Sequence, residues 1–225
     1  MNIRIGTFNL FQFVKPPYSY YEKKDRFTVE QWNSKYNWIK QQIQKMDCDV
    51  IGFQEVFSQE ELKNLTKELG FEYFQTVDTP RSDKNDEYIY ITTTVAIASK
   101  YPIENVHKVK PHIKSLQKHK LKRHFRFSRV PVKVDIRFKE DFIATFYVCH
   151  LKSNRENEFE YVFKADNTLE DKKKSVSKAL DLNFSESLRI RLCEASSLFF
   201  DMKKQNNPFV LLCDLNDKEF SATIE

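Results

Sequence analysis

Several polar side chains of the kinds that bind metal ions and phosphate stand at the ends of apolar runs in this 225-residue sequence. They are Asn9 after IRIGTF, Glu55 in DVIGFQE, His150 in FYVCH, and Asp214 after VLLC with Asn216 two residues later. Singly, each is explained as well by an ordinary strand end whose side chain bonds to local backbone. Together, carboxylate, amide and imidazole are the groups that hold a hard cation and a phosphate.

The number of carboxylates selects the cation. Glu55 and Asp214 supply too little charge for a Ca²⁺ site built from protein ligands alone. Mg²⁺ keeps several waters and binds through one or two carboxylates plus substrate oxygens. The set therefore predicts Mg²⁺-assisted chemistry on a phosphate group.

Strands and helices that could position these side chains follow from the hydrophobic pattern. Residues 3–10 and 49–55 predict buried strands, and β-branched and aromatic runs predict further strands over residues 71–77, 88–99, 130–138, 141–150 and 208–217. Apolar residues spaced three or four positions apart predict three amphipathic helices. Their apolar faces are Trp32, Tyr36, Ile39, Ile43 and Met46 in the first, Leu62, Leu65 and Leu69 in the second, and Leu188, Leu192, Ala195 and Phe199 in the third. Interleaved helices and strands indicate an α/β layered sandwich.

Local signals mark where two of the helices begin and end. Ser58 and Glu61 have the spacing of a capping box, and Gly70 is expected to end that helix in the left-handed conformation. Ser185 is expected to cap the last helix. The chain contains three glycines and no Pro-, Gly- or Ser-rich linker, so we expect a single domain over residues 1–225.

The cysteines and the N-terminus bear on the compartment. Cys48, Cys149, Cys193 and Cys213 are scattered singly with no C-x-x-C pair, which favours free thiols over a disulfide framework or a zinc site. No apolar run approaches the roughly 18 to 20 residues that cross a bilayer, and the chain opens on a strand pattern rather than a signal peptide. We therefore expect a soluble, unprocessed, cytoplasmic protein.

Positive charge is concentrated in one segment. Residues 105–134 contain ten Lys and Arg and no acidic residue, although the net charge of the whole chain is only +5. Four of the five histidines also lie there and would add charge at slightly acidic pH: His107, His112, His119 and His124. The segment is either a surface that attracts phosphate or a solvated connection, and the charge pattern leaves both open.

The segments that carry the candidate residues resemble the endonuclease/exonuclease/phosphatase superfamily, which has the deoxyribonuclease I-like fold. The matching segments occur in the family's order, between residues 3 and 217: TFNL, DVIGFQEV, VAIASKYPI, RFSRVPV, VCHLKS and LLCDLND. The HLKS form of the histidine motif is most similar to bacterial members. The resemblance implies a four-layer α/β/β/α sandwich, C-terminally incomplete in this sequence.

The resemblance also implies roles for the candidate residues. Glu55 would be the principal Mg²⁺ ligand with Asn9 beside it, and Mn²⁺ could substitute for Mg²⁺. His150 would donate to the phosphoryl group, and Asp214 would position or deprotonate the attacking water. Asn216 would hold Asp214 or the phosphate in place.

Three further residues have weaker assignments. Arg129 and Lys152 stand beside family motifs and could contact the substrate phosphate, although surface Lys and Arg rarely have such a role. Glu87 resembles the carboxylate that orients the histidine in deoxyribonuclease-like members, with Asp83 and Asp86 competing for that role.

The end of the chain departs from the family. Members carry an Asp-His pair downstream of the D-x-N motif, and that histidine usually serves as the general base. No histidine follows His150 in this sequence, which ends at Glu225. We expect either a fragment of a longer protein or impaired activity, and we favour the fragment.

Three functions are consistent with these residues. The first is a Mg²⁺-dependent phosphodiesterase that cuts nucleic acid, which the basic segment supports. The second is a phosphatase or phospholipase acting on an inositol phosphate or a sphingolipid head group, which needs a compact pocket or a membrane-facing loop such as residues 18–27. The third is a non-catalytic nucleic-acid-binding domain, which would bind without turnover.

Overall fold

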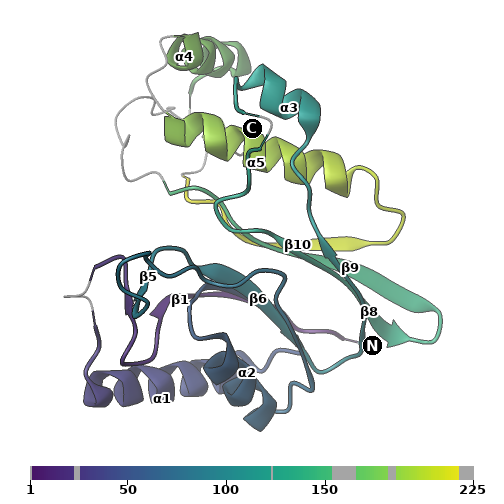
Figure 1. Ribbon diagram of the computed structural model, residues 1–225. Helices are drawn as coiled ribbons and strands as arrows, with labels where there is room; N and C mark the ends of the chain where they lie inside the picture. Colours follow the sequence, from purple (N-terminus) through teal and green to yellow (C-terminus); the bar gives the residue numbers. More distant parts are fainter. Residues whose placement is uncertain (1, 23–25, 123, 154–165, 182–185, 218–225) are drawn as a thin grey trace. The chain divides into compact units, whose positions relative to one another are not determined.

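A computed structural model describes the chain except for residues 1, 23–25, 123, 154–165, 182–185 and 218–225 (Figure 1). Its residues group into two compact units. The first contains Met1–Lys108, Arg129–His150 and Asn206–Cys213, and the second contains Val109–Ser128, Leu151–Gln205 and Asp214–Glu225. The expectation of a single domain stays a prediction.

The first sheet of the first unit has the strand order β1-β3-β6-β4. Its strands are β1 (Ile5–Phe13), β3 (Val50–Val56), β6 (Thr94–Ser99) and β4 (Tyr73–Gln75). β1 runs parallel to β3, and β6 runs antiparallel to both β3 and β4. β1 and β3 therefore run toward the same edge of the sheet. Glu55 is the last residue but one of β3, whereas β1 continues for four residues beyond Asn9, which was expected to end it.

Helices α1 (Val29–Met46) and α2 (Gln59–Glu68) form a core with this sheet. Trp32, Ile39 and Ile43 of α1 are buried against apolar side chains of β1 and β3, which confirms the predicted stripe. Gly70 ends α2 with φ +86°, a conformation that glycine adopts without a Cβ clash.

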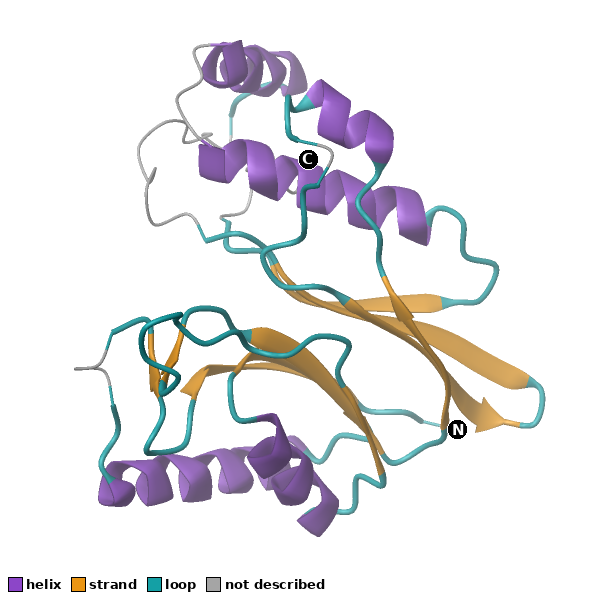
Figure 2. Cartoon of the chain, viewed as in Figure 1, coloured by secondary structure: helices purple, strands orange, loops and turns teal. Residues whose placement is uncertain are grey.

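The second sheet of the first unit has the order β10-β9-β8-β7. Its strands are β10 (Phe209–Asp214), β9 (Phe142–His150), β8 (Val132–Lys139) and β7 (Ile103–Lys108), drawn in orange in Figure 2. Residues of β3 and β6 share a second core with β8, β9 and β10. A short pair, β2 (Ser19–Tyr20) with β5 (Ile89–Tyr90), forms a separate small sheet.

The two sheets pack closely at Gly52. A Cβ added to Gly52 would lie 2.8 Å from Leu212 Cβ and 3.0 Å from Val148 Cγ2. Such distances are well inside normal carbon contact, so the sheets reach this separation only because the position has no side chain.

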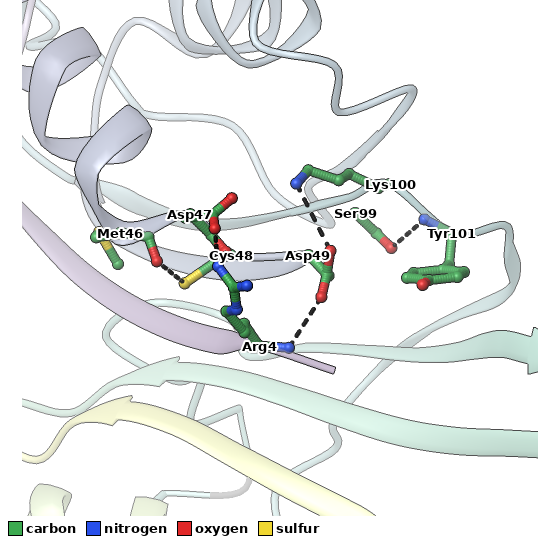
Figure 3. Close-up of polar contacts among 8 residues, drawn as sticks. All are labelled: Arg4, Met46, Asp47, Cys48, Asp49, Ser99, Lys100 and Tyr101. Carbon is green, nitrogen blue, oxygen red and sulfur yellow. Dashed lines mark hydrogen bonds and ion pairs between the residues drawn. The ribbon is translucent and has the colours of Figure 1, made fainter. Parts of the chain in front are cut away.

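The strand starts on the opposite edge from Asn9 and Glu55 are held by polar contacts (Figure 3). The Asp49 carboxylate accepts the Arg4 backbone N–H at 2.9 Å and lies 3.6 Å from Lys100 Nζ. Arg4 also forms an exposed ion pair with Asp47. Because Asp49 precedes β3 and Arg4 precedes β1, these contacts align the two parallel strands before they run toward the site.

The second unit contains helices α3 (Ile113–Lys118), α4 (Leu169–Asp181) and α5 (Glu186–Met202). The start of α3 is bonded to α5, because the His112 N–H donates to Ser197 Oγ at 2.9 Å and the His112 ring stacks on Phe200. The basic segment, residues 105–134, contains most of strand β7 and all of helix α3.

The predicted apolar face of α5 is wrong in part. Leu188 is buried, but Phe199 is 54% exposed. The buried face instead includes the charged residues Arg191 and Glu194. The apolar stripe did not predict the whole buried face of α5, because hydrogen bonds to neighbouring backbone, as well as apolar contacts, determine which side chains of this helix are buried.

The predicted capping box of α2 does not form. Ser58 makes no side-chain cap bond, and its Oγ accepts the Lys15 N–H at 2.8 Å. Glu61 is paired with Lys15 Nζ at 3.0 Å. The capping box occurs instead at α1, where Thr28 Oγ1 accepts from Gln31 N at 3.2 Å and Gln31 Oε1 accepts from Thr28 N at 2.8 Å. The expected cap at Ser185 lies outside the described residues.

The prediction of four free thiols is also wrong. Cys149 of β9 and Cys213 of β10 form a disulfide with a Cα–Cα distance of 4.7 Å, whereas Cys48 and Cys193 are free and buried. The two bonded cysteines are 64 positions apart, and only the pairing of β9 with β10 makes them neighbours. The expectation of a cytoplasmic protein rested on free thiols, and this bond removes that ground.

Among the helices that the structure describes, none has both the length and the hydropathy needed to span a bilayer.

Candidate functional site

A double irregularity of the first sheet shapes the ends of β1 and β3. β1 pairs Asn9 with Gln54 and then Phe13 with Val56, so residues 10–12 oppose Glu55 alone. The β3–β6 ladder shifts register over the same stretch, between Phe53 and Val56. Bulges of this kind re-aim side chains and are frequent next to active sites. Glu55 therefore leaves the regular alternation of its strand.

The backbone at this bulge is strained. Phe11, Gln12 and Glu55 have φ values of 48°, 65° and 60°, in the left-handed region that L-residues normally avoid at a cost of roughly 1 to 2 kcal/mol each. Non-glycine residues persist there only where the surroundings hold them. The strain is concentrated at the two strand ends that carry predicted metal ligands.

Two hydrogen bonds hold the strained segment and bring Asn9 and Glu55 into one local structure. The Gln12 N–H donates to Glu55 Oε2 at 2.8 Å, and the Phe11 N–H donates to Asn9 Oδ1 at 2.9 Å. Both side chains are half-buried. The structure thus supports the grouping of these two residues, while their role as ligands stays a prediction.

Lys35 of α1 is a third member of this group that the sequence interpretation missed. Its Nζ donates to the Phe11 carbonyl at 2.6 Å and lies over the rings of Phe11 and Phe27. Burial lowers the pKa of Lys35, and the negative charge of Glu55 partly opposes that shift. The spacing of Lys35 in the sequence could have indicated this location. Lys35 lies three residues after Trp32 and four before Ile39, and so on the buried side of the helix.

The donor set is compatible with Mg²⁺. The described residues contain no cluster of three or more His, Cys, Asp and Glu side chains that could form an all-protein metal cage. One carboxylate, Glu55, with the neighbouring amide oxygen of Asn9 is the sparse kind of set that Mg²⁺ uses when water and substrate phosphate complete its shell. These two residues would hold the ion.

His150 ends β9 and belongs to the same unit as Asn9 and Glu55. It is only 3% exposed. Glu87, predicted to orient this histidine, is exposed in the turn before β5, and no hydrogen bond or ion pair of its side chain is found among the described residues. Its competitors serve local turns: Asp83 accepts the Asn85 N–H and Asp86 accepts the Tyr88 N–H. The assignment of Glu87 stays a prediction without structural support.

Asp214 and Asn216 are held in a tight turn of the second unit. Asn216 has φ 51°, and its N–H donates to Asp214 Oδ1 at 2.9 Å. The Asn216 side chain donates to the Leu151 carbonyl at 2.9 Å, and the Leu151 N–H donates to the Asp214 carbonyl at 3.0 Å. The backbone of Asn216, rather than its side chain, therefore orients the Asp214 carboxylate, and the side chain binds the residue that follows His150.

Lys152 and Arg129 are half-buried. Lys152 is held through its backbone, since its N–H donates to Glu194 Oε2 at 2.7 Å. Phosphate contact by either side chain stays a prediction. So does the convergence of the whole set, because Asn9, Glu55 and His150 belong to one unit and Asp214 and Asn216 to the other.

The basic segment exposes most of its cationic side chains. Those described as exposed are Lys108, Lys110, Lys114, Lys118, Lys120, Lys122 and Arg126. His119 is an exception to the expectation that the histidines add charge. It is buried, and burial together with the nearby Lys118 lowers its pKa. The burial of His119 therefore opposes the gain of positive charge that was expected of it at slightly acidic pH.

A cavity of about 500 Å³ lies beside the segments that follow β1 and β3. Tyr18 and Tyr90 stack at 5.0 Å on its wall, and Phe57 contributes a third ring. Lys15 and Glu61 supply charged groups of opposite sign. Phe57, which lines this cavity, comes two residues after Glu55 in the sequence.

Comparison with known proteins adds a family match. The model of the Endonuclease/Exonuclease/phosphatase family matches residues 6–224. No curated protein matches the chain.

Similar solved structures share the fold at low sequence identity. A β-hairpin deletion mutant of beta toxin from Staphylococcus aureus aligns with a TM-score of 0.54 and 17% identity, covering 99% of this chain and 70% of its own. The human Nocturnin catalytic domain aligns with a TM-score of 0.54 and 14% identity, covering 87% of this chain and 61% of its own. A humanized D. rerio TDP2 aligns with a TM-score of 0.52 and 9% identity, covering 97% of this chain and 63% of its own. These likenesses confirm the predicted fold class, a deoxyribonuclease I-like α/β sandwich.

This chain spans 61% to 70% of the length of those three structures.

Proposed function

Because the chain belongs to the endonuclease/exonuclease/phosphatase family, we propose that it hydrolyses a phosphodiester bond of a nucleic acid with the help of Mg²⁺. The observation that carries this proposal is the strained double bulge that groups Asn9 with Glu55. Such strain has a cost in stability, and it is typical of sites where side-chain placement matters more than stability. Bound Mg²⁺ would neutralise negative charge on a non-bridging phosphate oxygen.

The other predicted residues would act on the same phosphoryl group. His150 would donate a hydrogen bond to it and stabilise the charge that grows as water attacks in line. Asp214 would orient that water or accept its proton. The bond from Asn216 N–H to Asp214 Oδ1 supports this role, because it fixes the direction of the carboxylate.

A nucleic acid is proposed as substrate because of the exposed basic side chains between Lys108 and Arg126. Lys and Arg that face solvent can neutralise backbone phosphates and release counterions, which supplies most of the affinity for a polyanion. The rest of the chain carries a net negative charge, so this segment is the part suited to such a partner.

The direct test is hydrolysis by the purified chain. Plasmid nicking and cleavage of single-stranded DNA and RNA should require Mg²⁺, stop with EDTA and resume when Mg²⁺ or Mn²⁺ is restored. Glu55→Gln, His150→Ala and Asp214→Asn should each lower the rate by at least roughly 100-fold, the scale of a removed catalytic group.

A matched control is Glu72→Gln, which makes the same chemical change as Glu55→Gln at an exposed carboxylate outside the proposed site. It should keep the wild-type rate. Wild-type turnover in two of the three site variants would reject the proposed mechanism. Nucleic-acid binding that EDTA does not affect, without any cleavage, would instead identify a non-catalytic binding domain.

A second candidate is a phosphatase or phospholipase that acts on an inositol phosphate or a sphingolipid head group. The cavity lined by Tyr18, Phe57 and Tyr90 favours it, since a pocket of about 500 Å³ has the size of a small-molecule site. Release of phosphate from inositol phosphates, or of a phosphorylated head group from vesicles containing sphingolipid, without cleavage of DNA or RNA would support this candidate over the first.

A further inference from the structure

Two charged side chains of α5, Arg191 and Glu194, are fully buried with 0% exposure. They are three residues apart and so lie on the same face of the helix. Burying an ionised group removes its hydration, and such groups are retained only where specific partners replace the lost water. The identity of those partners therefore indicates what the two residues do.

Glu194 binds two backbone N–H groups from different segments. Its Oε1 accepts from Ser128 N at 2.6 Å, and its Oε2 accepts from Lys152 N at 2.7 Å. Both oxygens act as acceptors, which requires a carboxylate. A glutamine at this position could satisfy one N–H but would turn its own amide N–H₂ toward the other.

Arg191 binds the same segment from the other side. Its Nη1 donates to the Lys152 carbonyl at 3.4 Å, and its Nε donates to Asp217 Oδ2 at 2.9 Å. The side chain of Asp217 is 5% exposed, so this ion pair is buried. The N–H and the carbonyl of Lys152 are thus both bound by α5, one by Glu194 and the other by Arg191.

The segments held in this way carry predicted site residues. Lys152 follows His150 by two positions, and Asp217 directly follows Asn216. The segments are also bonded to each other, through Leu151 N–H to the Asp214 carbonyl and Asn216 Nδ2 to the Leu151 carbonyl. α5 therefore binds a joined pair of loops at two points.

We propose that Arg191 and Glu194 are positioning residues for hydrolysis, which act by fixing the backbone of the loops that carry Lys152, Asp214 and Asn216. This inference rests on the proposed function. Neither side chain is assigned any contact with substrate. A pair that only stabilised α5 would need no bond to the two loops, whereas Glu194 and Arg191 bind the backbone of Lys152 and Arg191 also binds Asp217.

The test compares Glu194→Gln and Arg191→Lys with Leu198→Ala, which removes a buried apolar side chain from the same helix. All assays are run below the melting temperature of every variant, with folding checked by circular dichroism. We expect kcat to fall about 10- to 100-fold in Glu194→Gln, with KM changed less than threefold. Leu198→Ala should have a lower melting temperature and an unchanged kcat.

Amide hydrogen exchange supplies a readout independent of turnover. Exchange at Lys152 should accelerate at least tenfold in Glu194→Gln and stay at the wild-type rate in Leu198→Ala. If Glu194→Gln does not fold, Arg191→Lys replaces it in the same comparison and is expected to show the same changes. Lysine keeps the positive charge but lacks the planar guanidinium that reaches both the Lys152 carbonyl and Asp217.

The outcomes separate this proposal from the one on which it rests. Suppose that the wild-type chain hydrolyses the substrate. The positioning role would then be overturned, and the proposed function left intact, if kcat were unchanged in Glu194→Gln or if kcat fell equally in Leu198→Ala. A wild-type chain that cleaves no phosphodiester would overturn the proposed function and the positioning role with it.

Discussion

Cys149 and Cys213 are joined by a disulfide, and the residue after each is a predicted site residue, His150 or Asp214. Directly after the end of β9, the Leu151 N–H donates to the Asp214 carbonyl at 3.0 Å. The ends of β9 and β10 are therefore tied by a covalent bond and then by a hydrogen bond.

Reduction of this disulfide should destabilise the protein. A cross-link between residues 64 positions apart restricts the unfolded chain, and loss of such a bond typically costs about 2 to 4 kcal/mol. We expect the reductant dithiothreitol to lower the unfolding free energy of the wild type and to have no such effect on the Cys149→Ser/Cys213→Ser double variant. A count of four reactive thiols, rather than two, in denaturant without reductant would contradict the bond.

Nucleic-acid affinity should depend on the basic segment and on salt. Replacing the exposed residues Lys114, Lys118 and Lys122 by Gln should weaken binding and reduce the slope of log K against log salt by about 2 to 3. The matched control replaces exposed lysines outside the segment, Lys45, Lys63 and Lys67, and removes the same total charge. Equal loss of affinity in both triple variants would show that net charge, not this segment, governs binding.

Gly52→Ala should destabilise the packing of the two sheets. The added Cβ would lie 2.8 Å from Leu212 Cβ, and overpacking of this kind costs about 1 to 3 kcal/mol. Thermal unfolding should show a melting temperature lower by roughly 3 to 10 °C. Gly70→Asn is the control, because nothing lies within 4 Å of a Cβ at Gly70 and Asn tolerates positive φ. An unchanged melting temperature in Gly52→Ala would be inconsistent with the close packing.

Acid should destabilise the fold through His119. Burial, reinforced by the charge of Lys118, lowers the pKa of His119 below its usual 6.5. Between that lowered pKa and 6.5, the unfolded chain binds a proton that the folded chain does not, so the unfolding free energy falls as pH falls through this window. Urea unfolding at about pH 7.5 and 5 should show a smaller pH dependence in His119→Gln than in the wild type. His124→Gln, at an exposed position, should behave like the wild type.

Removal of the α1 cap should weaken the helix start. Thr28→Ala loses the Oγ1 that accepts the Gln31 N–H, which typically costs about 1 kcal/mol. Chemical denaturation should show this loss, whereas Thr28→Ser keeps the hydroxyl and should stay close to the wild type. A similar loss in both variants would point to the Thr28 methyl group rather than the hydrogen bond.

Periodic segments were predictable because their pattern is local. The stripe from Trp32 to Ile43 predicted α1, and the alternating apolar runs predicted β3, β8 and β9 close to their observed bounds. The order of the family motifs was likewise readable, and it identified Asn9, Glu55, His150, Asp214 and Asn216 as site candidates.

Features that depend on partners distant in the chain were not predictable. The capping box expected at Ser58 is absent because Ser58 Oγ instead accepts an N–H from Lys15, 43 positions away. The apolar stripe of α5 named a face that is only partly buried, since Glu194 finds its partners at Ser128 and Lys152. A helical pattern carries no information about such partners.

The sequence alone therefore determined the α/β class, the helices and strands with strong periodicity, and the residue types available for phosphate chemistry, because these depend on composition and on short-range spacing. Only the tertiary structure decided the Cys149–Cys213 bond, the strained bulge that joins Asn9 to Glu55, and the burial of Arg191 and Glu194. Each of these depends on which strands and loops become neighbours, and that is settled by packing and hydrogen bonding across the whole chain.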